Sequence, residues 1–286
     1  MSRDDRNAER ARHPFRGSPR ALSGKRRSSG CPTLCAASML PQLKAMSNHD
    51  YRTALYEHYA SGLSRAESDL SNDAGRQPYF EQLVSRHLPN RSARILELGA
   101  GSGALLTYLR SQGFAHITGI DGSPEQVALA QQRGVDVQLG DVLDALRDAD
   151  TGSHDVIIAL DVIEHFDKEE AFTLVQEIAR VLTPEGRCII HTVNADSPFF
   201  GSIRYGDFTH ETAFNRSSIT QVLTTVGFQR VACFEDRPVV HGLKSFARSV
   251  IWAVARNTAT LVLAAETGVL SRDRILSQNF LTVADK

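Results

Sequence analysis

The chain has 286 residues, of which 42% are hydrophobic and 23% charged, and this composition is typical of a folded globular protein. The net charge of −1 combines a basic start with an acidic body, because residues 1–46 carry 10 Lys and Arg against 3 Asp and Glu, whereas residues 47–286 carry 22 against 30. An acidic body argues against nonspecific nucleic-acid binding, which relies on neutralising phosphates, so we expect no nucleic-acid partner.

The sequence contains no apolar stretch of the kind that forms a signal peptide or a membrane-spanning helix. The first thirty residues have no apolar run, and three polar residues interrupt the longest apolar region, 250–265. The cysteines lack the paired spacing of zinc sites, and we expect reduced thiols at Cys31, Cys35, Cys188 and Cys233. Together these features predict a cytoplasmic protein.

Residues 1–46 have no hydrophobic period and are rich in basic, Ser, Pro and Gly residues. This composition predicts a disordered basic tail. A basic tail can bind RNA or anionic lipid, but helical patterning first begins after Met46, which favours a solvated extension.

From residue 47 onward, predicted helices and strands alternate. The helical patterns cover residues 51–61, 77–87, 104–112, 124–133, 168–182 and 217–226. The strand patterns cover residues 94–98, 117–120, 135–139, 155–160, 187–193 and 228–234. This alternation is typical of a parallel sheet with helices on both faces, so the sequence predicts a doubly wound α/β domain from about residue 90.

A glycine-rich turn follows the first predicted strand, in the stretch ILELGAGSGALL. Gly99, Gly101 and Gly103 allow positive φ angles and a close approach of the backbone to a ligand. The helix that follows presents its N-terminus, which suits a nucleotide-like ligand. With Ala104, the same turn also satisfies the dinucleotide-binding fingerprint, so the glycines alone leave two cofactor classes open.

Three acidic residues at successive strand ends distinguish between these classes. Glu97 lies two residues before the first glycine, where its charge would repel a pyrophosphate but tolerate a ligand with a cationic amino group. Asp121 ends the second strand, where it can bind ribose hydroxyls. Asp141 ends the third strand and can accept a hydrogen bond from an adenine amine. Each acid alone is explained equally well as a helix cap or turn residue, but three in this order favour a phosphate-free cofactor.

The motifs ELGAGSG, GIDGS, GDV, DVIEHF and LTPEGRCII resemble, in order and spacing, those of class I S-adenosylmethionine-dependent methyltransferases over about residues 90–235. The resemblance implies S-adenosylmethionine as cofactor and a seven-stranded, mostly parallel, Rossmann-like sheet, whose antiparallel strand residues 279–285 can supply. It also implies an acceptor pocket over the carboxyl ends of strands four and five. The expected cofactor-binding residues are Glu97, Gly99, Ala100, Gly101, Gly103, Asp121, Gly122, Ser123, Asp141, Val142 and Leu160.

Four parts of the chain follow from this assignment. The tail, residues 1–46, precedes N-terminal helices at 47–90 that cover the cofactor site, a methyltransferase core at 91–237, and a helical lid or insertion with the last strand at 238–286. The last part carries an apolar helical stripe: Phe246, Val250, Val254 and Leu261. We interpret it as a lid or homodimer face, with an interfacial helix over 243–265, peripheral to the inner membrane face, as the alternative.

Two histidines are the candidate catalytic residues. A hydroxyl acceptor must lose its proton during methyl transfer, and histidine is the usual base. His165 follows the fourth strand in DVIEHF, and His210 lies in FFGSIRYGDFTHETAF. A helix-capping role explains His165 equally well.

The same residues can form a metal site. Asp161, Glu164, His165 and His210 together offer oxygen and nitrogen ligands for a divalent cation, with Mg²⁺ the expected ion. The D/E-x-x-E-H run resembles that of ubiquinone-pathway O-methyltransferases and small-RNA 3′-end methyltransferases, in which it coordinates metal. Here the first position is aspartate where those families have glutamate.

The acceptor is expected to be a small molecule, a glycan or a lipid-linked sugar that is methylated on oxygen. This expectation rests on SIRYGDFTHETAF and PVVHGLKSFARS, which resemble methyltransferases of polysaccharide and lipopolysaccharide biosynthesis. One alternative is an NAD-dependent sugar-nucleotide oxidoreductase or epimerase, but the Tyr-x-x-x-Lys pair that it needs is absent. The other is a noncatalytic methyltransferase-like binding module, against which the joint presence of Glu97 and Asp121 argues.

Overall fold

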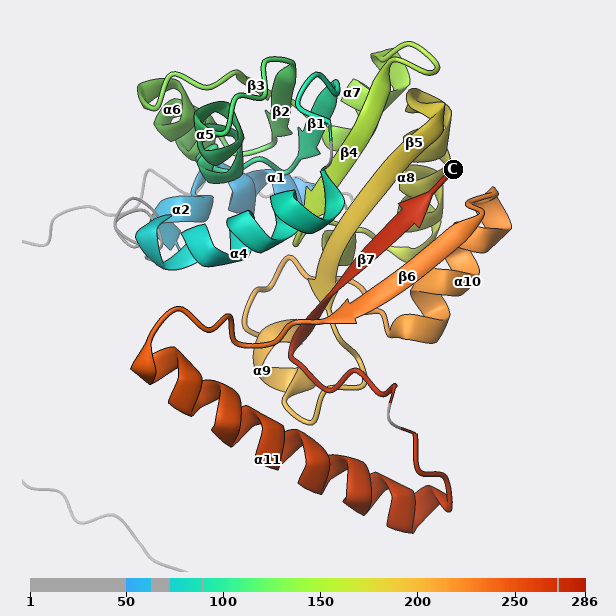
Figure 1. The fold of residues 1–286 in the computed structure, drawn as a ribbon. Coiled ribbons are helices and arrows are strands. Elements are labelled where there is room, and N and C mark those ends of the chain that lie inside the picture. Colours follow the sequence, from blue (N-terminus) through green and yellow to red (C-terminus); the bar gives the residue numbers. More distant parts are fainter. Residues whose placement is uncertain (1–49, 63–72, 89, 272) are drawn as a thin grey trace, which may run out of the picture. The chain divides into compact units, whose positions relative to one another are not determined.

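The computed structural model describes residues 50–62, 73–88, 90–271 and 273–286 (Figure 1). The predicted disordered tail, including Cys31 and Cys35, lies outside the described residues. Residues 46–286 form one compact unit.

The described strands form one seven-stranded sheet in the order β3-β2-β1-β4-β5-β7-β6. They are β1 Ile95–Leu98, β2 Ile117–Asp121, β3 Val137–Leu139, β4 His154–Leu160, β5 Leu182–Val193, β6 Arg230–Glu235 and β7 Asn279–Asp285. Only β7 runs antiparallel to its neighbours, so the carboxyl ends of the other six strands share one edge. The predicted doubly wound, mostly parallel fold with an antiparallel C-terminal strand is confirmed.

Helices cover both faces of this sheet (Figure 1). The described helices are α1 Asp50–Glu57, α2 Tyr59–Gly62, α4 Asp73–His87, α5 Ala104–Ser111, α6 Pro124–Gln132, α7 Val142–Asp148, the 3₁₀ helix η1 Ile163–His165, α8 Lys168–Val181, α9 Phe200–Arg204, α10 Arg216–Val226 and α11 Leu243–Thr267, of which α11 lies apart from the sheet. Side-chain caps set several starts: Ser123 begins α6, and Asp167 and Asn215 form capping boxes for α8 and α10.

Strand β4 shows why both faces need helices. Its side chains alternate between two apolar clusters, with Ile157 and Ala159 in one and Val156 and Ile158 in the other. The first cluster is completed by α7, α8 and α10, and the second by α4, α5 and α6. A strand buried on both sides fixes the sheet at the centre of the molecule, and the ligand edge is therefore built on a rigid base.

Several element boundaries differ from the sequence prediction; α4, for example, begins at Asp73 rather than at residue 77, and β6 spans Arg230–Glu235 rather than residues 228–234. Strand β5 begins at Leu182 rather than at residue 187, because Leu182 already pairs with His154 before an irregularity in the register. Pro184 and Gly186, which predict a turn, therefore lie inside the strand, where an irregular register tolerates them. The predicted helix at 51–61 is divided into α1 and α2.

The apolar stripe predicted in the last part of the chain lies on α11 and is exposed. Phe246, Val250, Val254 and Leu261 are between 48% and 63% exposed, whereas Ser245 and Thr260 are the buried residues of this helix. The stripe thus does not pack on the described part of its own chain, and the homodimer and membrane alternatives stay predictions. Among the described helices, none is long and apolar enough to cross a membrane.

Candidate active site

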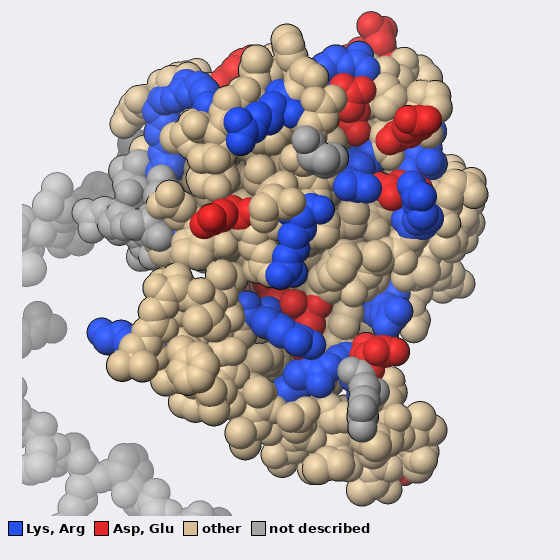
Figure 2. All heavy atoms as spheres, viewed as in Figure 1, with Lys and Arg blue, Asp and Glu red and all other residues tan. Residues whose placement is uncertain are grey.

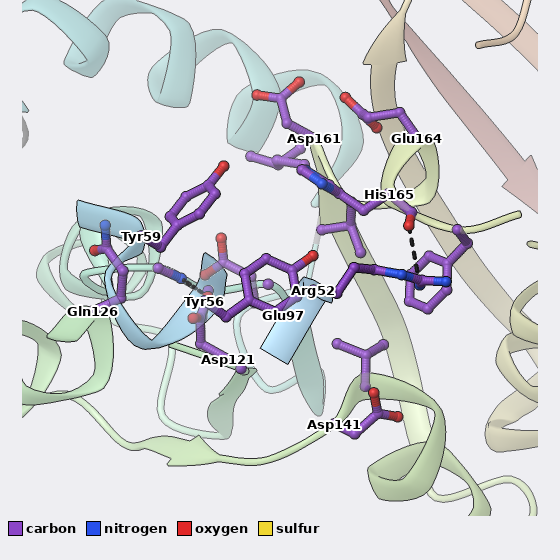
Figure 3. A pocket seen from close by; sticks show the side chains of 18 of the residues that line it. Arg52, Tyr56, Tyr59, Glu97, Asp121, Gln126, Asp141, Asp161, Glu164 and His165 are labelled. Atoms are coloured by element: carbon purple, nitrogen blue, oxygen red, sulfur yellow. Dashed lines mark hydrogen bonds between the residues drawn. The ribbon is translucent and has the colours of Figure 1, made fainter. Parts of the chain in front are cut away.

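A pocket of about 890 Å³ opens at the carboxyl edge of the sheet (Figure 3). Nine of the eleven predicted cofactor residues line it, and so do all four predicted metal ligands. The two that do not are Gly103 and Ser123. Gly103 precedes α5 in a left-handed conformation, and a Cβ there would lie 2.4 Å from Val135 Cγ2. Ser123 caps α6, so both residues shape the loop from outside the pocket.

The glycine turn approaches the pocket without side chains. Gly99 has φ of +63°, and a Cβ at this position would lie 2.5 Å from Val162 Cγ2, so only glycine fits between the turn and the segment after β4. Asp121 holds the turn in place, because its carboxylate accepts hydrogen bonds from the backbone N–H groups of Gly101 at 2.7 Å and Ser123 at 2.8 Å. Burial nevertheless raises the pKa of Asp121, against the lowering effect of these two bonds.

Glu97 is the most unusual acid of the pocket. It is 4% exposed, and its Oε2 atom has no hydrogen-bond partner among the described residues. Burial raises its pKa to about 8, although Arg76 opposes the shift. A buried carboxyl that lacks a partner favours a cationic ligand group and disfavours an anionic one.

Asp141 is exposed and caps α7, since Oδ1 accepts from the N–H groups of Leu143 and Asp144. A helix-capping role therefore accounts for Oδ1 of Asp141. Oδ2 has no hydrogen bond among the described residues, and it is the atom through which Asp141 can bind a ligand. Val142 and Leu160 add apolar surface nearby.

Helices α1 and α2 form one wall of the pocket. Figure 3 shows Tyr56 and Tyr59 projecting into the same space as Glu97 and Asp121. Arg52 attaches α1 to the core through Glu170 at 2.7 Å and through the His165 carbonyl at 3.2 Å. These described helices lie where the sequence predicts a covering segment.

The predicted metal site does not assemble. Asp161 has φ of +57°, and its Oδ1 lies 2.6 Å from His191 Nδ1. Glu164 accepts a hydrogen bond from Thr192 at 2.8 Å through Oε2, and burial raises its pKa to about 8. Among the described residues, no group of three His, Cys, Asp or Glu side chains is arranged to hold a metal ion. The prediction of a divalent cation at Asp161, Glu164, His165 and His210 is not supported, because three of these side chains have other partners.

His165 and His210 do come together. Their ring centroids are 4.7 Å apart, and both line the pocket. His165 Nδ1 lies 2.8 Å from Thr209 Oγ1, which in turn donates to Asp207 Oδ1 at 2.6 Å. His210 Nδ1 has no hydrogen-bond partner among the described residues. His165 is thus the more firmly held of the two candidates.

Sequence analysis missed His191, which lies in the buried strand β5. Its imidazole bridges two carboxylates, with Asp161 at 2.6 Å and Asp236 at 2.8 Å. Although burial opposes it, these carboxylates raise the pKa of His191 well above its ordinary value, so the ring is an imidazolium near neutral pH. The available signal is the isolated histidine in the apolar run CIIHTV, since a buried imidazole needs polar partners.

The family assigned to this chain agrees with the geometry of the pocket. A family described as "Methyltransferase domain" matches residues 73–232, which is more than half of the chain. The chain belongs to the methyltransferase domain family. The class I S-adenosylmethionine-dependent resemblance seen in the sequence is thereby confirmed, and the dinucleotide alternative loses its support.

Curated relatives of this methyltransferase domain match part of the chain. It is 32% identical over 116 residues to a ubiquinone biosynthesis O-methyltransferase of Xylella fastidiosa, covering 39% of this chain and 46% of the relative. It is 33% identical over 129 residues to a trans-aconitate 2-methyltransferase of Mycobacterium tuberculosis, covering 45% and 48%. The chain thus spans slightly less than half the length of these relatives.

A solved structure shares the fold over about three quarters of this chain. The S-adenosylmethionine-dependent methyltransferase from Archaeoglobus fulgidus superposes with a TM-score of 0.57 at 19% identity, covering 77% of this chain and 99% of that one. Identity this low supports the fold alone.

The hydrogen-bond acceptors of the pocket match the donor groups of S-adenosylmethionine. The cofactor carries an ammonium group, which suits the unpartnered Glu97 carboxyl, and no phosphate. Asp121 keeps acceptor capacity for ribose hydroxyls, because each carboxylate oxygen has two lone pairs. Asp141 Oδ2 remains for the adenine amine. These assignments stay predictions.

Replacing Asp121 by alanine is expected to weaken S-adenosylhomocysteine binding by about 1–3 kcal/mol, because it releases the glycine turn and leaves buried N–H groups without acceptors. Isothermal calorimetry measures the change. Asp136→Ala, at an exposed position before β3, is the control and should bind like wild type. Equal affinity of Asp121→Ala and wild type would show that Asp121 neither orders the turn nor binds the ligand.

Proposed function

We propose that the protein transfers a methyl group from S-adenosylmethionine to an oxygen of its acceptor, with His165 removing the acceptor proton. The cofactor, when bound, supplies an electrophilic methyl group on a sulfonium. The chain must then align the acceptor and provide a base. The observation that carries the proposal is the hydrogen-bonded series Asp207–Thr209–His165 at the pocket wall.

This series determines which nitrogen of His165 is basic. Thr209 has one hydroxyl proton, and it donates that proton to the Asp207 carboxylate. The Thr209 oxygen must therefore accept from His165, so Nδ1 carries the proton of the neutral ring. Nε2 then has a free lone pair, and no described residue donates a hydrogen bond to it. A neutral imidazole held in one tautomer at the pocket wall is a suitable base for a hydroxyl.

The environment keeps this imidazole neutral. Burial, followed by the neighbouring His210, lowers the pKa of His165 to about 4. The neutral form therefore prevails through the physiological range. Activity is therefore expected to fall on acidification only at a lower pH than for an exposed histidine, for which the loss begins near pH 6.5.

The rate of methyl transfer is expected to stay within about twofold between pH 8 and about pH 5.5, because His165 is not protonated until lower pH. Transfer of a radiolabelled methyl group to a panel of hydroxylated acceptors, measured at each pH, tests both the activity and the base. An acid limb with its midpoint near 6.5 that disappears in His165→Asn would contradict the lowered pKa.

Oxygen is the proposed acceptor atom because a base is present, whereas an amine acceptor needs none. The name of one curated relative, a ubiquinone biosynthesis O-methyltransferase, agrees with this choice. Phe199, Tyr205 and Phe208 are 59%, 76% and 82% exposed in and around α9, beside the pocket residues Ile203 and His210. Exposed aromatic rings suit sugar or apolar acceptors, which supports a glycan or lipid-linked acceptor in polysaccharide biosynthesis. A cytoplasmic or membrane-peripheral location stays a prediction.

A further inference from the structure

A second pocket, of about 620 Å³, lies beside the end of β6 and is unusually rich in arginine. Its lining comes from α4, from the start of α10, from β6 and the two residues that follow it, from α11, and from β7 and the segment before it. The charged residues that line it are Arg86, Arg216, Arg237, Arg256, Arg274, Glu235, Asp236 and Asp273. Figure 2 views this face, on which basic and acidic side chains gather between α11 and the sheet domain.

Two of the three carboxylates in this arginine pocket are already neutralised. Glu235, whose side chain is 5% exposed, binds Arg256 at 2.8 Å and Arg237 at 2.9 Å. Asp236 binds the imidazolium of His191. These pairs build the pocket wall and use two of its five guanidinium groups.

The other three guanidinium groups, those of Arg86, Arg216 and Arg274, have no carboxylate partner in the described part of the chain. The terminal nitrogens of Arg86 nevertheless donate to the Gln82 side-chain oxygen at 2.8 and 2.9 Å. Arg216 reaches a backbone carbonyl at 3.4 Å, and Arg274 reaches Thr267 and Val269 at 3.4 Å, all long contacts. The Nε atom of Arg274 is buried without a partner among the described residues. A buried donor without an acceptor is costly, so a donor in a cavity needs an acceptor, which a ligand oxygen can supply.

The arginine pocket adjoins the methyl-transfer pocket. Asp161 lines the first pocket and Asp236 lines the second, and His191 joins them. Tyr79 lines the arginine pocket with its ring 5.9 Å from His191, and its buried hydroxyl has no partner among the described residues. The bonded side chains of Asp161, His191 and Asp236 therefore form the wall between a ligand held by the arginines and the transfer site.

We propose that the arginine pocket binds a phosphate or diphosphate group carried by the methyl acceptor. Guanidinium groups recognise phosphate oxygens through paired hydrogen bonds, and three of them from separate segments match a group with many oxygens better than a single carboxylate. The assignment of the phosphate to the acceptor rests on the proposed methyl transfer, whereas anion binding itself does not. The phosphate belongs either to a soluble metabolite or to a lipid-linked acceptor, for which the exposed apolar side of α11 is a suitable neighbour.

Calorimetric titration of the full chain with inorganic pyrophosphate tests the proposal. We expect saturable one-to-one binding that weakens with added salt, because the contacts are ionic. Arg86→Gln combined with Arg216→Gln, and separately Arg274→Gln, should weaken it at least about tenfold, which is roughly 1.4 kcal/mol. Arg230→Gln is the matched control, since Arg230 is an exposed arginine at the other end of β6 and pairs with Asp285. It should bind pyrophosphate as wild type does.

Co-sedimentation with phosphatidylcholine vesicles, with and without phosphatidic acid, separates the two sources. Vesicle binding that pyrophosphate displaces and the double variant lacks supports a lipid-linked phosphate, whereas pyrophosphate binding without vesicle binding supports a soluble one. Absence of saturable pyrophosphate binding, or equal binding by wild type and the arginine variants, overturns the proposal. Binding of S-adenosylhomocysteine by the wild-type protein is measured in parallel. If the wild type does not bind it, the methyl-transfer proposal is overturned instead.

Discussion

Replacing His165 by asparagine is expected to lower kcat by about 100-fold or more, the usual contribution of a positioned base. The asparagine amide can still donate to Thr209, as Nδ1 does, but it offers no basic nitrogen in place of Nε2. Affinity for S-adenosylhomocysteine should change by less than about twofold, because the cofactor side of the pocket is untouched. Single-turnover kinetics and calorimetry measure the two quantities.

Variants of Thr209 distinguish a histidine that acts as the base from one that has only a structural role. Thr209→Val removes the acceptor that sets the His165 tautomer, so kcat should fall, and Thr209→Ser should restore it. His154→Asn is the control, since His154 begins β4 at the opposite edge of the sheet and bonds Ser153. If His165→Asn turns over like wild type, the proton-transfer assignment fails and methylation of nitrogen, which needs no base, becomes the better account.

Replacing His191 by alanine is expected to lower the free energy of unfolding by about 2–4 kcal/mol, because it leaves two carboxylates facing a cavity without their cation. The lower part of this range is appropriate, since the side chain of Asp161 is 50% exposed and that of Asp236 33%. The melting temperature should fall by roughly 5–10 °C for a domain of this size. Asp236→Asn added to His191→Ala should recover part of the loss.

The pH dependence identifies the charge on His191. Its pKa is raised on folding, so its stabilisation is complete below the ordinary pKa of 6.5 and is lost as the pH rises through the raised value. The pKa of Asp161 is lowered on folding, so its part persists down to about pH 4 and is lost below it. The difference in the free energy of unfolding between wild type and His191→Ala should therefore be largest near pH 5–6.5 and should decrease at alkaline pH. Denaturant unfolding at both ends of this range checks it, and a gap independent of pH would show that packing, not charge, is responsible.

The residues that sequence reasoning placed correctly are those whose roles depend on local geometry. Gly99 and Gly101 follow a strand directly, and Asp121 ends the next one, so parallel pairing brings them to one pocket. The alternation of helices and strands likewise predicted a parallel sheet with helices on both faces, and the two apolar clusters on either side of β4 agree with it.

The misplaced features depend on contacts between distant segments. Asp161, Glu164 and His165, with His210, were predicted to hold a divalent cation. The backbone at Asp161 is left-handed, however, and its carboxylate lies against His191, 30 residues away in β5. Asp236, directly after β6 and 45 residues away in the chain, bonds the same histidine. No local pattern encodes such a bridge, and the arginine pocket, assembled from several separate segments, was missed for the same reason.

Calorimetric titration of the purified chain with S-adenosylhomocysteine and with NAD⁺ tests the central claim most directly, since it needs no acceptor. The geometry of Glu97, the glycine turn and Asp121 predicts one-to-one binding of S-adenosylhomocysteine with a dissociation constant in the low-to-middle micromolar range, which corresponds to about −6 to −8 kcal/mol. It predicts no binding of NAD⁺ at the same concentrations, because its pyrophosphate would meet the Glu97 carboxyl. Tight binding of NAD⁺ without binding of S-adenosylhomocysteine would contradict the account.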